Sequence, residues 1–182
     1  ARRAELAGEM SEARAASAAA FEREIATELE RLSMPGASLE VVLEPVSGGY
    51  GASGAETVEL RLAPNPGIEP GPLGDAASGG ELSRVMLALS GLGGGGAATL
   101  AFDEIDAGVG GSVADSVGRM MKQLGGSTQV LAVTHLAQVA ACADHHFVVS
   151  KALQGGATVS DVQPVAGEAR VAEVARMLGG ER

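Results

Sequence analysis

The sequence has almost no aromatic residues. Tryptophan is absent, and three phenylalanines and one tyrosine make up 2% of the 182 residues. A stacking platform for single-stranded nucleic acid needs several aromatic faces, so this composition argues against one. Lysine and arginine together number 13 against 23 aspartates and glutamates, and the formal net charge is −10. Because such a charge repels phosphate backbones, we expect no direct nucleic-acid binding by this chain alone.

Cysteine is nearly absent as well. The lone Cys142 excludes an internal disulfide and indicates a reducing compartment. Its neighbours in the stretch 139–143 are apolar, so we expect a buried, inert thiol. The sequence shows no signal peptide and no apolar run long enough to span a bilayer. The predicted location is therefore the cytoplasm, with no membrane partner.

The third absence is a phosphate loop. That motif, Gly-x-x-x-x-Gly-Lys-Ser/Thr, needs a lysine, and the chain has only Lys122 and Lys151, which follow Met121 and Ser150. The glycine run 93–96 has no lysine after it and is interpreted as a low-complexity loop. No complete nucleotide site is expected on this chain.

Residues 1–36 are predicted to form one long helix and its stop. Alanine, glutamate and arginine dominate and favour helix, and Pro35-Gly36 ends it. Apolar residues recur in steps of three and four. A helix of about 50 Å is too long to pack wholly on a small domain. We interpret residues 1–36 as the end of a coiled-coil arm whose partner helix is missing; a long surface helix is the alternative.

Residues 37–182 are predicted to form the α/β part of the chain. Expected strands cover 39–44, 57–63, 99–102, 129–133, 147–150 and 158–165, and expected helices cover 78–89, 112–124, 136–143 and 168–178. The proline-rich stretch 64–74 is expected to be an irregular connector. Helices between apolar runs imply partly parallel strands. Both ends look truncated, because the chain begins at Ala1 without methionine and stops just after Gly180.

The turn Ser78-Gly79-Gly80-Glu81 begins the first of the later helices. Serine at the N-cap and glutamate three residues on are typical of a capping box. A cap needs no glycine, and each glycine costs up to about 1 kcal/mol in a helical turn. Two glycines therefore indicate that a ligand approaches the backbone closely, as a phosphate does at a helix N-terminus. The expected buried face of this helix comprises Leu82, Val85, Met86 and Leu89.

Two carboxylates, Asp103 and Glu104, follow the apolar run 99–102. A buried strand delivers such side chains to the edge of the sheet where ligands bind in open α/β folds. One carboxylate can hold Mg²⁺, usually through water, and the next can orient an attacking water. A strand end with solvated acids is the plain alternative.

Two further polar residues follow these strands. Asp106 begins a glycine-rich loop able to pass close to another surface, with an ordinary turn residue as the alternative. Ser112 and Asp115 are expected to cap the next helix. His135 ends the next apolar strand, and if the two strands are parallel neighbours it lies at the same sheet edge as Glu104. His145 and its neighbour point apart, so no metal site is expected there.

Together, these pieces resemble the signature motif, Walker B strand and switch histidine of ABC-type ATPase heads of the structural-maintenance-of-chromosomes (SMC) kind. Within that family the chain is most similar to the RecN type of bacterial double-strand-break repair proteins. The likeness lies in residues 77–84, 102–111 and 133–140 and in the tail 174–180. The chain departs from the usual pattern in having Ala77 where most ABC ATPases have leucine, and in the glycine run.

The resemblance implies the C-terminal lobe of an ATPase head, with the phosphate loop on a missing N-terminal lobe. It implies that two heads dimerise around ATP, with Ser78, Gly79 and Gly80 on the γ-phosphate of the opposite subunit and Asp106 crossing the interface. Asp103 would serve Mg²⁺, Glu104 would polarise the hydrolytic water, and His135 would sense the γ-phosphate. DNA, repair and recombination, and association with the nucleoid follow from the family alone.

Two alternatives differ in class. One is a fragment of the nucleotide-binding domain of a membrane transporter, in which a helical subdomain leads into the signature; here a strand pair and a proline-rich connector precede it. The other is a non-catalytic coiled-coil scaffold with vestigial motifs, against which Glu104 argues, since loss of activity often removes that carboxylate. The favoured prediction is an ATPase whose isolated C-terminal part is inactive.

Overall fold

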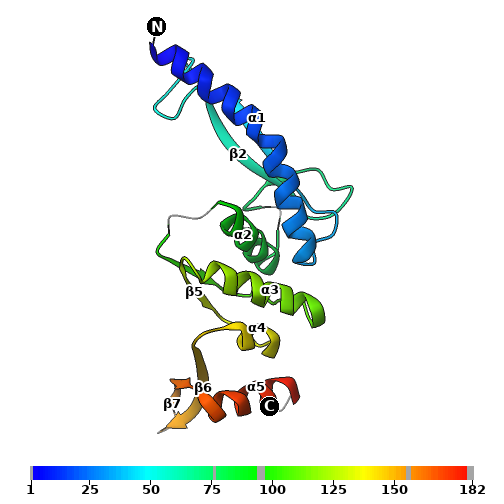
Figure 1. Ribbon diagram of the computed structural model, residues 1–182, viewed down its shortest axis with the longest axis vertical. Coiled ribbons are helices and arrows are strands. Elements are labelled where there is room, and N and C mark those ends of the chain that lie inside the picture. Colours follow the sequence, from blue (N-terminus) through cyan, green and yellow to red (C-terminus); the bar gives the residue numbers. More distant parts are fainter. Residues whose placement is uncertain (1, 76, 94–96, 155–156, 180–182) are drawn as a thin grey trace. The chain divides into compact units, whose positions relative to one another are not determined.

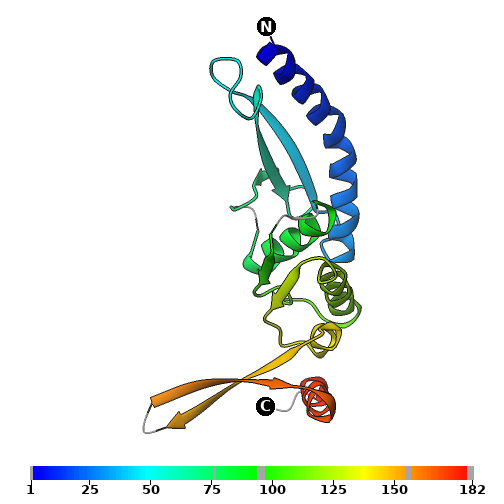
Figure 2. The same ribbon diagram turned by 60° about the vertical axis from the view of Figure 1, so that its left-hand side comes forward.

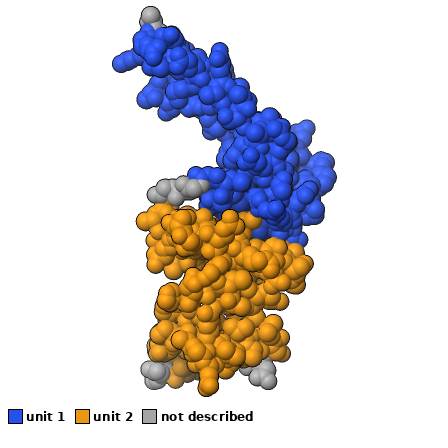
Figure 3. All heavy atoms as spheres, viewed as in Figure 1, with its two compact units in different colours: residues 1–96 blue, residues 97–182 orange. Residues whose placement is uncertain are grey.

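The computed structural model describes residues 2–75, 77–93, 97–154 and 157–179 and divides into two compact units, residues 1–96 and 97–182 (Figure 3). Unit 1 contains α1 (Arg2–Arg31), β1 (Ser38–Pro45), β2 (Glu56–Ala63), β3 (Gly71–Pro72) and α2 (Gly79–Gly93). Unit 2 contains β4 (Thr99–Phe102), α3 (Gly111–Leu124), β5 (Gln129–Ala132), α4 (Ala137–Cys142), β6 (His146–Gln154), β7 (Ala157–Val165) and α5 (Gly167–Gly179). The predicted α/β class is confirmed. The glycine run at 94–96 lies outside the described residues.

The long helix α1 is present as predicted and lies along the antiparallel β1–β2 hairpin (Figure 1, Figure 2). Its apolar residues Ile25 and Leu29 are fully buried. The carboxylate of Glu22 accepts a hydrogen bond of 2.8 Å from the backbone N–H of Val41 on β1. These contacts fasten the second half of the helix to the hairpin.

The first half of α1 is held near the hairpin tip. Arg14 donates a 2.7 Å hydrogen bond to the carbonyl oxygen of Ser53 and lies 3.5 Å from the carboxylate of Glu56. The β1–β2 hairpin therefore contacts both halves of α1, whereas the sequence predicts a helix too long to pack wholly on a small domain. Leu6 and Met10 remain exposed, at 42% and 41%. The coiled-coil arm over residues 1–36 stays a prediction.

The chain leaves α1 through a tight turn. Ser33 and Gly36 both have positive φ, and a Cβ on Gly36 would stand 2.5 Å from Cγ of Pro66. Only glycine fits there without a shift. Within the stretch 64–74, expected to be irregular, Gly71 and Pro72 form the short strand β3 against β2. An edge strand tolerates a proline because its outward side needs no N–H donor.

The helix α2 begins where the serine–glycine turn predicts and packs against α1. Its buried face differs from the expected one. Val85, Leu87 and Ala88 are buried, whereas Met86 is 44% exposed. The guanidinium group of Arg84 is also buried, and burial holds the pKa of that group below its ordinary value. The pattern of apolar residues alone misses this face because α2 is apolar on more than one side.

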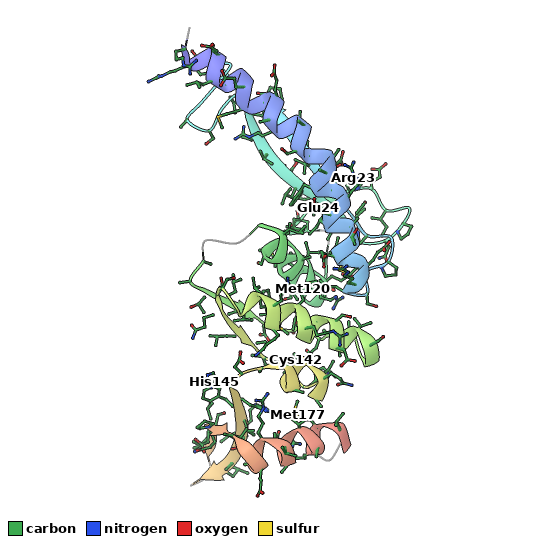
Figure 4. The ribbon with its side chains drawn as sticks, viewed as in Figure 1. Arg23, Glu24, Met120, Cys142, His145 and Met177 are labelled. Atoms are coloured by element: carbon green, nitrogen blue, oxygen red, sulfur yellow. The ribbon has the colours of Figure 1, made fainter. Side chains whose placement is uncertain are left out.

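Unit 2 is built around a parallel pair of strands. β4 and β5 pair from Thr99↔Gln129 to Phe102↔Ala132, which confirms the predicted parallel arrangement. The crossover helix α3 packs against α4 so closely that a Cβ on Gly118 would lie 2.8 Å from the sulfur of Cys142. Figure 4 shows Cys142 on α4. Its thiol is half-buried and donates to the carbonyl oxygen of Gln138, in keeping with a structural role.

The predicted cap of α3 is wrong. The helix begins at Gly111 with Gly110 as its N-cap, and no side chain caps it. Ser112 and Asp115 therefore lie inside the first turns, two residues later than a capping box requires. The extended Gly110 and the left-handed Gly111, at φ 54, let the helix start early.

The β6–β7 hairpin is long, antiparallel and strongly exposed (Figure 2). Both strands were predicted, and β6 extends further than expected. Its exposed apolar side chains are Phe147, Val149, Leu153, Val159 and Val162. The terminal helix α5 buries none of its described residues and exposes Val171 and Leu178.

One arginine links α5 to α4. Arg170 donates hydrogen bonds to the carbonyl oxygens of Ala140, Ala141 and Ala143, at 3.2, 3.2 and 2.6 Å. These carbonyls belong to the C-terminal end of α4, where a positive charge is favourable.

We predict that Arg170→Ala lowers the free energy of unfolding of unit 2 by about 1–3 kcal/mol, because it leaves several carbonyl oxygens without a charged donor. The measurement is urea unfolding followed by circular dichroism. Arg176→Ala on the same helix is the matched control, since Arg176 pairs locally with Glu173 three residues earlier. Its loss is expected to be about 0.5 kcal/mol or less. Equal losses in both variants would contradict the capping role.

Candidate functional site

The serine–glycine turn of unit 1 forms the predicted capping box. The backbone N–H and the hydroxyl of Ser78 each donate a 2.8 Å hydrogen bond to one carboxylate oxygen of Glu81, and the N–H of Glu81 points back to the serine oxygen at 3.4 Å. Ser78 and Gly79 are exposed, whereas Gly80 is buried. The N-terminal end of α2 therefore lies at the surface of unit 1 with its first turn preorganised.

The capping contacts act on the charge of Glu81. The backbone and side-chain hydrogen bonds from Ser78 hold the pKa of this carboxyl below its ordinary value of 4.5. An ionised carboxylate at this position favours the helix N-terminus. Ser78 and Gly79 remain exposed on this turn.

The acidic pair of unit 2 lies directly after β4. Asp103 and Glu104 are both exposed, and the backbone N–H of Glu104 donates a 2.9 Å hydrogen bond to Oδ1 of Asp103. Glu104 adopts a left-handed backbone conformation, with φ 54. Non-glycine residues in this conformation are uncommon and concentrate at functional sites. The next residue, Ile105, is fully buried and anchors the turn in unit 2.

Asp106 is the buried polar centre of this region. Its residue is 3% exposed, and its Oδ2 accepts a 2.5 Å hydrogen bond from the hydroxyl of Thr134 and a 3.0 Å hydrogen bond from the backbone N–H of His135. The loop after β4 is thereby joined to the turn after β5.

The imidazole of His135 completes this group. Its Nδ1 lies 3.2 Å from Oδ2 of Asp106, and its side chain is 71% exposed. A proton on Nδ1 shared with the carboxylate leaves Nε2 as the nitrogen available to a ligand. The exposed acidic pair and the exposed imidazole thus follow the carboxyl ends of two hydrogen-bonded parallel strands.

The side chains available as metal ligands decide which kind of Mg²⁺ site this region could form. Among the described residues, no group of three or more His, Cys, Asp or Glu could hold a metal ion, so a cage made of protein ligands is not present in this part of the chain. Mg²⁺ usually keeps several waters and binds through one or two carboxylates plus substrate phosphates. The exposed Asp103 at a strand end fits that second kind of site.

The curated relatives of this chain that are described below share one name. No family model matches the chain. It is 48% identical to the DNA repair protein RecN of Deinococcus radiodurans over 154 residues, covering 84% of this chain and 27% of that protein. It is 44% identical to the DNA repair protein RecN of Streptomyces coelicolor over 195 residues, covering 98% of this chain and 34% of that protein. This is a RecN-type chain. It spans about a third or less of the length of these curated relatives.

Solved structures place the fold of the RecN-type chain among SMC heads. The Smc head domain with a coiled coil and joint from Pyrococcus yayanosii matches with a TM-score of 0.60 at 22% identity, over 94% of this chain and 32% of that one. A structure from work on ATP-driven dimerization and DNA-stimulated activation of SMC ATPases matches with a TM-score of 0.50 at 20% identity, over 89% and 93% of the two chains. None of the described helices has the length and apolar character needed to cross a membrane.

The predicted site residues of the RecN-type chain fall into two groups. Ser78, Gly79 and Gly80 belong to unit 1, and Asp103, Glu104, Asp106 and His135 belong to unit 2. Within unit 2 the structure brings Asp106 and His135 into contact, as the parallel strands allowed. The carboxylate of Asp106 is turned into its own unit, and its role across an interface stays a prediction.

Sequence reasoning missed Thr134. Its hydroxyl donates to Asp106 and accepts a 3.0 Å hydrogen bond from the backbone N–H of Leu136. The only signal was a hydroxyl residue directly before the histidine, and its partner lies 28 residues away along the chain.

We predict that Glu81→Gln destabilises the chain by about 0.5–1 kcal/mol at pH 7, because the cap loses its charge. Since the pKa of Glu81 is lowered in the folded chain, this contribution is present above pH 4.5 and is lost as pH falls through the folded-state value. The measurement is urea unfolding between pH 7 and pH 3. Glu24→Gln, on the exposed surface of α1 (Figure 4), removes the same charge without touching the cap. A difference between wild type and Glu81→Gln that does not shrink in acid would contradict the prediction.

Proposed function

We propose that this chain is the C-terminal part of an ATP-binding and ATP-hydrolysing head that closes as a homodimer on ATP and acts in DNA double-strand-break repair and recombination. One observation carries the proposal: the pairing of β4 with β5 sets an acidic pair and a histidine at the carboxyl ends of neighbouring parallel strands. This is the edge at which ligands bind in open α/β folds.

Each residue of unit 2 has chemistry suited to phosphoryl transfer. Glu104 is exposed and ionisable, and it would orient and polarise the attacking water. His135 would contact the γ-phosphate through Nε2, which its contact with Asp106 leaves available. Asp103 would hold Mg²⁺ through water; when bound, that ion neutralises charge on the phosphates.

The N-terminal end of α2 suits the other side of a nucleotide. Its exposed Ser78 and Gly79 precede a helix of 15 residues whose first N–H groups have no partner within the helix. Such an end attracts phosphate. We assign Ser78, Gly79 and Gly80 to the γ-phosphate of a nucleotide held by the opposite head.

The phosphate loop would come from an N-terminal lobe. Lys122 pairs with Asp144, and Lys151 lies on the exposed strand β6, so neither serves a phosphate cradle in this structure. Unit 2 also exposes apolar side chains that a buried sheet would cover, among them Leu131 at 53% and Val133 at 68%. We propose that the missing lobe covers this surface and supplies the loop.

The assignment to DNA repair follows from the relatives, which are named DNA repair protein RecN and align with most of this chain. ATP-driven dimerization is described for an SMC ATPase that shares the fold. The net charge of −10 gives no support for direct DNA contact by this chain. DNA contacts, and any association with the nucleoid in the cytoplasm, are therefore assigned to the complete protein.

We predict that the chain alone hydrolyses no measurable ATP, because it lacks the lysine of a phosphate loop. Phosphate release is the measurement, with the chain joined to the phosphate-loop lobe as positive control. Robust hydrolysis by the chain alone that Glu104→Gln abolishes would contradict the division of the site between two lobes.

We also predict that, in the assembled head, Glu104→Gln lowers the rate of ATP hydrolysis by about 100-fold or more while ATP binding persists. A dimer of the Glu104→Gln head should then accumulate in the presence of ATP, and light scattering after gel filtration detects it. Ser78→Arg is the contrasting variant, since the bulky arginine side chain would occupy the position proposed for the γ-phosphate and should abolish the dimer. A Glu104→Gln head that stays monomeric with ATP, or a Ser78→Arg head that still dimerises, would count against the proposal.

A further inference from the structure

The carboxylate of Asp106 is engaged inside unit 2 through one of its oxygens. Its Oδ2 accepts hydrogen bonds from the Thr134 hydroxyl and the His135 backbone N–H, at 2.5 and 3.0 Å, and lies 3.2 Å from Nδ1 of the His135 imidazole. The side chain is 4% exposed. A buried carboxylate is stable only with such partners, because an unpaired buried charge is costly.

The loops on both sides of this carboxylate are themselves fixed. The backbone N–H of Val109 bonds to the carbonyl oxygen of Asp106 at 3.3 Å, and Ile105 beside it is fully buried. On the other loop, the hydroxyl of Thr134 accepts from the N–H of Leu136 while donating to Asp106. The contact between Asp106 and His135 therefore joins two preorganised turns.

We propose that Asp106 is a positioning residue that acts within its own unit: it holds the His135 ring by Nδ1 and so makes Nε2 the nitrogen that faces the nucleotide. With its proton held on Nδ1, the neutral ring offers Nε2 as an acceptor, and the imidazolium offers an Nε2–H donor to a phosphate oxygen. The inference rests on the proposed function. It differs from the interface role expected from resemblance, because this carboxylate already accepts two hydrogen bonds from its own unit and lies beside the His135 ring.

The first test reads the imidazole directly and needs no nucleotide. The chain has three histidines, so long-range ¹H–¹⁵N NMR spectra are assignable with His145→Gln and His146→Gln variants. In the neutral ring we expect the His135 proton on Nδ1. Exposed His145, on the segment before β6 (Figure 4), is the internal reference. A wild-type His135 whose proton sits on Nε2, as in an unconstrained histidine, would overturn the inference.

Two variants extend this test. Asp106→Asn is nearly isosteric, and we expect the Nδ1–H population of His135 to fall toward that of His145. Thr134→Val removes one donor but leaves the histidine contact, so we expect the Nδ1–H form to persist. Circular dichroism checks that each variant folds. If Asp106→Asn does not fold, the wild-type spectrum still decides. A folded Asp106→Asn variant with an unchanged tautomer would overturn the inference.

The second test separates action within a subunit from action across the dimer. In assembled heads, differently tagged subunits form heterodimers in which Glu104→Gln silences one catalytic centre. Asp106→Asn is then placed either in the Glu104→Gln subunit or in the other subunit, so both heterodimers carry the same two substitutions. We expect ATP hydrolysis to be about 10-fold slower when Asp106→Asn shares a subunit with the intact Glu104. The reverse order, or equal rates, would overturn the inference.

The two tests fail differently. Heads that neither dimerise nor hydrolyse ATP contradict the proposed function, while the tautomer of His135 still decides whether Asp106 positions the ring. A correct tautomer with the reverse order of heterodimer rates overturns the functional claim and leaves the proposed ATPase intact.

Discussion

A single buried carboxylate connects the two loops that carry the polar residues of unit 2. Asp106 accepts two hydrogen bonds from the Thr134–His135 turn and lies 3.2 Å from the His135 imidazole, and where the two loops begin the backbone N–H of Val133 bonds to the carbonyl oxygen of Phe102. Hydrogen bonds to a charged acceptor each contribute about 1.5–3 kcal/mol, and the same carboxylate buried without them would be strongly unfavourable. The position of the exposed imidazole therefore depends on the burial of its acidic neighbour.

In the proposed function, the remainder of the molecule supplies parts of a site that other lobes or subunits complete. Unit 1 contains a preorganised helix N-terminus, and unit 2 contains the carboxylates and an imidazole. In the part of the chain that the structure describes, neither lysine belongs to a phosphate loop. The β6–β7 hairpin exposes apolar side chains on a two-stranded ribbon, which is marginal in water by itself. Both features support the proposal that another lobe covers exposed apolar surface of unit 2 and supplies the phosphate loop.

Local patterns predicted the elements well wherever one physical signal dominated. The capping box at Ser78 and Glu81 formed as expected, because its hydrogen bonds span only three residues. The parallel pairing of β4 and β5 followed from the crossover helix between them. Predictions were wrong where neighbours in space decide: the buried face of α2 excludes Met86, and α3 begins at Gly111 instead of after a Ser112 cap.

The amino-acid sequence alone determined which residues follow which strands, where the helices begin within a turn, and that no phosphate loop accompanies them. These properties depend on residue type and short spacing. Only the tertiary structure decided that Asp106 turns inward onto His135 and that Thr134 belongs to the same group, because their partners are 28 and 29 residues apart in the chain. Such contacts arise when two strands pair and carry their following loops together, which no local pattern encodes.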